Sequence, residues 1–165
     1  MRFAAHYDYT VGPQAVSELL CDRDYLLAAA TAAGAKSSQV EVNPGPEGGF
    51  TVTIRSTMPT AGLPASARGF LPQGLELRQA LVWESAAGDG SRQGTMAGEV
   101  AGAGVHLSGL TRLSAVGDGS RLEFAGEVKA QVPLVGRAIE EAAVPAIVKV
   151  LDTQHEVASD WLRPD

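Results

Sequence analysis

The fold is decided by the C-terminal stretch Leu134–Leu162, which reads LVGRAIEEAAVPAIVKVLDTQHEVASDWL. Its apolar residues recur at steps of three and four, and this spacing predicts one amphipathic helix of about seven turns. Pro145 interrupts the pattern, because proline lacks the N–H that would bond to Glu141 and its ring clashes with that carbonyl. We therefore expect the chain to end in a long helix that is bent near Pro145.

Ahead of this helix, six segments alternate apolar and polar residues with a period of two, as half-buried strands do. In the clearest of them Phe50, Val52 and Ile54 face one way and Thr51, Thr53 and Arg55 face the other. The six segments are centred on residues 40–42, 50–55, 75–84, 96–100, 105–113 and 122–128. A further segment of this kind, residues 2–9, opens the chain, and two short helical segments follow it, starting near Pro13 and Asp22.

This order predicts an α+β fold, in which a curved antiparallel sheet of about seven strands wraps around the C-terminal helix and two short helices follow strand 1. We expect residues 1–165 to form a single domain, because this length is typical of one. Glycine is abundant, with 19 residues, and aromatic residues make up only 5%. Small residues let strands bend and leave space inside, so the composition favours an apolar cavity between the sheet and the helix.

The expected walls of this cavity come from alternate positions of the strands and from one stripe of the last helix. We expect them to contain Leu77, Leu81, Leu107, Phe124, Ile139, Ala143 and Ile147.

A long segment between two strands, residues 58–74, contains three prolines and its own apolar side chains. Long ordered loops in compact domains are often lids, so we expect a gate that carries Leu63, Phe70 and Leu71. The alternative is a loop that packs on the core.

The motif GDGSR occurs twice, at residues 88–92 and 117–121, each time between two alternating runs. Asp-Gly supplies the residues that a tight hairpin turn requires. The alternative is a calcium loop, but one aspartate per copy is too few to bind calcium. We interpret both copies as turns.

Charge and composition disfavour several classes of partner. The net charge is −6, whereas nucleic acids and anionic membranes require clustered Lys and Arg. Cys21 is the only cysteine, so no intramolecular disulfide forms, and the N-terminus has no apolar signal segment. We expect a cytoplasmic protein with no membrane insertion.

No recognised catalytic or cofactor motif is present. The chain lacks the glycine motifs of nucleotide-binding proteins and the Gly-x-Ser-x-Gly elbow of hydrolases. His6, His106 and His155 lie far apart without ligand spacing, so we predict no metal and no cofactor. His106 is expected on a solvated strand face, with a general base as the alternative, and His155 is expected to pack near the helix end. We assign no catalytic residue.

Several stretches together resemble a known family. They are Met1-Arg2-Phe3 with Pro13–Val16, Thr57–Thr60 followed by Gly62-Leu63-Pro64, Trp83-Glu84, Gly126–Gly136, and His155-Glu156 before Trp161-Leu162. In these stretches the chain resembles the START-like superfamily, also called SRPBCC or helix-grip, and within it an actinobacterial branch, domain of unknown function family 2505. The resemblance covers essentially the whole chain, and the Val-Lys-x-x-Val-Pro-Leu-Val-Gly junction is its most specific part. Pro145 departs from the pattern.

The resemblance implies an apolar cavity and carries over no catalytic residue. The function it favours is non-enzymatic binding of a small hydrophobic or amphipathic ligand, lipid- or polyketide-like, between sheet and helix. One alternative is an enzyme of the polyketide aromatase/cyclase type, which would need a buried acid/base pair. The other is an interaction protein with a filled core. The ligand, the pathway and the oligomeric state are not indicated.

Overall fold

The structure is a computed structural model that describes residues 1–61, 65–69 and 74–164. Its elements, in chain order, are β1 (Arg2–Tyr9), α1 (Pro13–Leu20), α2 (Arg23–Ala32), β2 (Ser37–Pro44), the short 3₁₀ helix η1 (Pro46–Gly48), β3 (Phe50–Met58), α3 (Ala65–Arg68), β4 (Leu75–Trp83), β5 (Arg92–Val100), β6 (Val105–Val116), β7 (Gly119–Ala130) and α4 (Gly136–Trp161).

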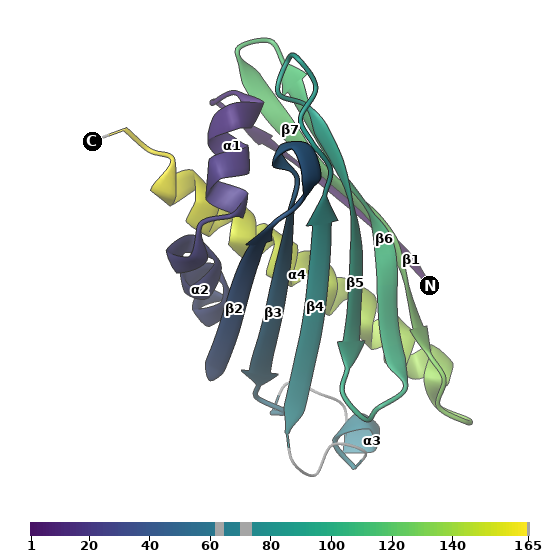
Figure 1. Cartoon of the computed structure of the whole chain (residues 1–165). Helices are drawn as coiled ribbons and strands as arrows, with labels where there is room; N and C mark the ends of the chain where they lie inside the picture. The colour runs from purple at the N-terminus through teal and green to yellow at the C-terminus, as the bar shows by residue number, and fades with distance from the viewer. Residues whose placement is uncertain (62–64, 70–73, 165) are drawn as a thin grey trace.

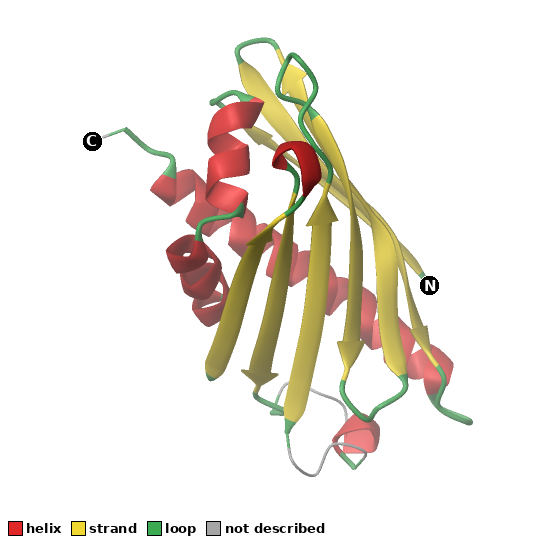
Figure 2. Cartoon of the chain, viewed as in Figure 1, coloured by secondary structure: helices red, strands yellow, loops and turns green. Residues whose placement is uncertain are grey.

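The seven strands form one antiparallel sheet in the order β1-β7-β6-β5-β4-β3-β2. Strands β2 to β7 follow one another as a meander. Strand β1 pairs with β7 and forms the edge of the sheet opposite β2. Helices α1, α2 and α4 all lie on one face of the sheet, and α4 crosses that face diagonally (Figures 1 and 2). The predicted curved sheet, long C-terminal helix and two short helices after the first strand are confirmed.

Both copies of the GDGSR motif lie at turns, as predicted, but the two turn residues of the second copy are Gly117 and Asp118 and not the expected Asp-Gly pair. The second copy contains a two-residue connection between Val116 and Gly119, in which Gly117 has a φ of 57°. The first copy lies at the end of the longer connection between β4 and β5, where the Asp89 carboxylate accepts a 2.9 Å hydrogen bond from the Ser91 N–H.

One cross-strand row in the β5–β6–β7–β1 half of the sheet contains two paired glycines, Gly109 and Gly126. Met96 is the neighbour of Gly109 in this row, and Phe3 is the neighbour of Gly126. A Cβ at Gly109 would lie 2.7 Å from Met96 Cε, and one at Gly126 would lie 2.8 Å from Phe3 Cζ. The two large side chains therefore fold over the glycines, which is the close approach that glycine in a strand permits.

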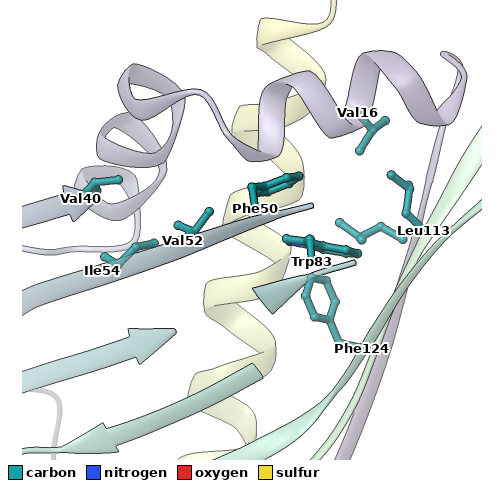
Figure 3. Close-up of a cluster of buried hydrophobic side chains, with 9 residues drawn as sticks. Val16, Val40, Phe50, Val52, Ile54, Trp83, Leu113 and Phe124 are labelled. Atoms are coloured by element: carbon teal, nitrogen blue, oxygen red, sulfur yellow. The ribbon is translucent and has the colours of Figure 1, made fainter. Parts of the chain in front are cut away.

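The main hydrophobic core occupies the end of the sheet next to α1 (Figure 3). Leu113 and Val16 are almost completely buried there, and the rings of Phe50 and Trp83 lie 6.3 Å apart. The members of this cluster are Val16, Val40, Phe50, Val52, Ile54, Trp83, Leu113, Leu122 and Phe124. Since this cluster gathers around α1 and the nearby strand ends, it leaves most of α4 without core contacts.

A second cluster fastens the C-terminal part of α4 to the two short helices. Leu19, Tyr25 and Ala29 pack there against Ala158 of α4. The Asp22 carboxylate caps α2, as predicted, by accepting hydrogen bonds from the N–H groups of residues 24 and 25 at 2.9 and 3.1 Å. This cap sets the start of α2 and hence the position of Tyr25.

Helix α4 begins two residues later and ends one residue earlier than the predicted stretch. It is helical through Pro145, and the bend expected there stays a prediction. At its N-terminal end, Glu140 accepts a 2.9 Å hydrogen bond from the Met1 amino group, which also donates to the Val128 carbonyl. No helix in the described parts of the chain has both the length and the apolar character needed to cross a membrane.

Candidate functional site

A cavity of about 420 Å³ lies between the sheet and α4. Its walls come from β1, the strands β3 to β7, the inner side of α2 and most of α4. Most side chains in these walls are apolar, and the polar ones are Ser56, Arg78, Gln79, Glu99, His106, Gln154, His155 and three tyrosines. Its volume falls within the range of small-molecule sites in proteins.

The cavity exists for two reasons. Helix α4 is held at the margins of the sheet, and many of the side chains that it turns toward the cavity are short. The helix packs against α2, β7 and β1, which leaves the middle strands of the sheet facing open space. Ala158 is the one fully buried residue among the described residues of α4. The cavity-lining residues of α2 and α4 include several with short side chains: Ala29, Ala30, Ala138, Ala142, Ala143 and Ala146.

The apolar residues selected from sequence lie in the cavity wall. Four come from strands and three from α4: Leu77, Leu81, Leu107, Phe124, Ile139, Ala143 and Ile147. Phe124 is buried and also belongs to the main core, while the others are partly exposed to the cavity. That they contact a ligand stays a prediction. The expected gate residues Leu63, Phe70 and Leu71 lie outside the described residues.

Sequence reasoning missed an aromatic group at the end of the cavity next to β1. Tyr7 and Tyr9 of β1 face the cavity together with His155 of α4. The His155 ring stacks on Tyr7, with centroids 5.0 Å apart and planes at 26°, and meets the Tyr9 ring at 4.9 Å and 66°. His155 thus has the packing role expected for it, and it also lines the cavity. The period of two in residues 2–9 placed both tyrosines on one face, but it did not say what lay opposite.

Two of the nearby tyrosine hydroxyls have protein partners. Tyr7 donates to the Asp152 carboxylate at 2.7 Å, and Tyr25 donates to the backbone carbonyl of Gln154 at 3.2 Å. Burial raises the pKa of all three cavity tyrosines, that of Tyr9 to about 12, and Asp152 raises the pKa of Tyr7 further. All three hydroxyls therefore stay protonated at neutral pH and can donate hydrogen bonds.

The polar groups at the other end of the cavity belong to the solvent-exposed side of the sheet. Arg78 lies 3.5 Å from Glu99, and His106 lies 3.9 Å from the same carboxylate. The His106 side chain is 55% exposed, as expected for a solvated face, and exposed ion pairs of this kind contribute little free energy. Within the residues that the structure describes, no group of three His, Cys, Asp or Glu side chains could hold a metal ion.

The sheet, the crossing helix and the cavity between them define a START-like, helix-grip protein. The crystal structure of TTHA0849 from Thermus thermophilus matches with a TM-score of 0.67 at 13% identity, over 99% of this chain and 100% of that chain. Human STARD10 matches with a TM-score of 0.62 at 6% identity, over 95% of this chain and 62% of that chain. A START superfamily protein from Mycobacterium smegmatis matches with a TM-score of 0.60 at 10% identity, over 98% and 99%. At these identities the likeness shows the fold alone.

The chain belongs to the family described as "Protein of unknown function (DUF2505)", whose model matches residues 4–162. No curated protein matches the chain in sequence.

Proposed function

We propose that this protein binds a small hydrophobic or amphipathic molecule, lipid- or polyketide-like, in the cavity between the sheet and α4. The observation that carries the proposal is the cavity of about 420 Å³, whose walls are mostly apolar. Each CH₂ group that a ligand buries there contributes about 0.8 kcal/mol of binding free energy. The proposal includes contact between the ligand and the wall residues, among them Leu77, Leu107 and Ile147.

The two alternatives have weaker support. A filled core would require side chains in the space that α4 spans, and a cavity of about 420 Å³ remains there, although Ile139 and Ile147 also line it beside the alanines of that helix. An aromatase/cyclase-type enzyme would require a convergent buried acid and base. The hydrogen bond between Tyr7 and Asp152 is exposed, and Tyr9 and His155 meet ring to ring without a hydrogen bond between them. Cytoplasmic location, an actinobacterial source and the absence of nucleic-acid partners remain expectations from sequence.

The direct test is native mass spectrometry of the protein purified from its own host, with organic extraction of what it carries. We expect a mass excess that extraction removes, and a blue-shifted emission of Nile red when the dye is added to the extracted protein. A measured mass equal to that of the protein alone, together with no binding of Nile red, would contradict the proposal.

A further inference from the structure

Two polar groups at the β1 end of the cavity lack hydrogen-bond partners. His155 Nδ1 is buried and has no partner among the described residues. The Tyr9 hydroxyl makes no hydrogen bond to the described residues either, in contrast to the hydroxyls of Tyr7 and Tyr25, but it is not among the fully buried unpaired atoms. Buried polar groups in native proteins are nearly always paired, so the unpaired imidazole nitrogen calls for an explanation.

The two groups are held in place by packing. The rings of Tyr9 and His155 lie 4.9 Å apart, and stacking on Tyr7 fixes the imidazole from the other side. The imidazole offers one donor and one acceptor when neutral, and the protonated tyrosine hydroxyl offers both. Together they match a single small polar group of a ligand whose remainder lies along the apolar walls.

The charges around this end favour a ligand head that is itself uncharged. Asp152 adds negative charge next to Tyr7, and the Arg121 guanidinium is held by Asp8 at 2.7 Å. The cavity wall also contains the cation Arg78, which lies in the same cross-strand row as Lys129 of β7. Tyr9 instead pairs with Ser120 of β7. At about 3.3 Å per residue, these two rows are roughly 30 Å apart along β7. Arg92 lies in the cross-strand row of Tyr7, but it is three strands away, packs over the Phe50 ring and donates to the Gly48 and Glu84 carbonyls. A buried carboxylate near Tyr9 would therefore have no compensating cation among these residues.

We infer that His155 and Tyr9 form a head-group subsite that selects amphipathic ligands with one uncharged hydrogen-bonding head, such as an alcohol, over chain-matched carboxylates. This inference rests on the proposed function. It names the class of ligand and the residues that recognise its polar end.

The test compares three compounds of equal chain length as competitors of Nile red at pH 8: dodecan-1-ol, 1-chlorododecane and dodecanoate. We expect the alcohol to bind about two- to tenfold more tightly than the chloroalkane, which is the effect of one buried hydrogen bond. We expect the ionised carboxylate to bind at least about tenfold more weakly than the alcohol. Tyr9→Phe keeps the ring and should reduce the preference for the alcohol over the chloroalkane.

The outcomes separate the inference from the proposed function. If none of the compounds displaces the dye from the wild-type protein, the proposed function fails and the inference falls with it. If alcohol and chloroalkane compete equally, or dodecanoate competes as well as the alcohol, the cavity binds apolar chains but the inference is wrong.

The inference can also be tested on the wild-type protein alone. The imidazole ¹⁵N resonances of His155 should shift when dodecan-1-ol is added, while those of the exposed His6 should not. Unmoved His155 resonances at saturating alcohol would overturn the inference.

Discussion

The ring of His155, on α4, stacks on the ring of Tyr7, on β1, with centroids 5.0 Å apart and planes inclined by 26°. The contact joins the two ends of the chain at one wall of the cavity, and Tyr7 adds a 2.7 Å hydrogen bond to Asp152, one turn earlier on the same helix. Helix α4 contacts the sheet through β1 and β7, at the margin of the sheet. The contact between His155 and Tyr7 therefore helps to set the width of the cavity.

The stacking contact predicts opposite effects for two substitutions of His155. His155→Phe keeps an aromatic ring against Tyr7 and removes the unpaired Nδ1, so stability should be unchanged or higher. His155→Ala removes the ring and should lower the free energy of unfolding by about 1–3 kcal/mol. Urea unfolding followed by circular dichroism measures both. A Phe variant as unstable as the Ala variant would mean that the imidazole nitrogens, and not the ring, hold the helix.

Filling the cavity should block binding without unfolding the protein. In Ala143→Trp the indole would project into the cavity, and we expect Nile red binding to fall at least about tenfold with an unchanged or raised Tm. Ser159→Trp places the same side chain on an exposed position of the same helix, outside the cavity wall, and is the matched control. Equal dye binding by the two variants would show that the dye does not enter this cavity.

The packing of Phe3 against β7 should require glycine at position 126. A Cβ there would lie 2.6 Å from the Ser108 carbonyl oxygen and 2.8 Å from Phe3, so Gly126→Ala should cost about 1–3 kcal/mol of unfolding free energy. Gly88→Ala is the control, because a Cβ at Gly88 meets nothing within 4 Å. Denaturant unfolding of the two variants compares them. Equal stabilities would show that β7 can shift away from Phe3 at little cost.

The contact between the N-terminus and α4 should make stability depend on acid pH. The hydrogen bond from the Met1 amino group holds the pKa of Glu140 below its ordinary value of 4.5. A lowered folded-state pKa contributes stability above pH 4.5 that is lost as the pH falls through the folded-state value. Glu140→Gln should therefore be less stable than wild type at pH 6, and the difference should disappear once the pH falls below the folded-state pKa of Glu140.

Thermal unfolding across this pH range provides the measurement. Glu156→Gln is the control, because Glu156 forms no ion pair with the described residues. A wild-type advantage that does not shrink as the pH falls below 4.5 would contradict the assignment.

Pro145 should limit the stability of α4. Proline in a helix interior is about 3 kcal/mol less favourable than alanine, so Pro145→Ala should raise the free energy of unfolding, in part by restoring the backbone bond to Glu141. If a bend at Pro145 shapes the cavity, dye binding should weaken in the same variant. A fall in stability would mean that the packing of α4 requires the bend.

The elements of this protein were predictable from sequence because each depends on neighbours along the chain. Alternation at Phe50, Val52 and Ile54 requires a strand with one buried face, and steps of three and four after Gly136 require an amphipathic helix. The Asp22 cap and the turn at Gly117 have equally local causes. These signals, taken in order, were sufficient to predict a curved sheet with a helix across it.

The head-group subsite and the size of the cavity were decided by tertiary structure. Tyr9 and His155 meet because β1 pairs with β7 in one register and α4 is fastened at Ala158, and neither fact is encoded near either residue. The cavity stays open because those marginal contacts hold α4 away from the middle strands, and many of the side chains that this helix turns toward the cavity are short. Periodicity tells which face of an element is apolar, but only the distance between packed elements determines whether that face is buried against protein or left to line a space.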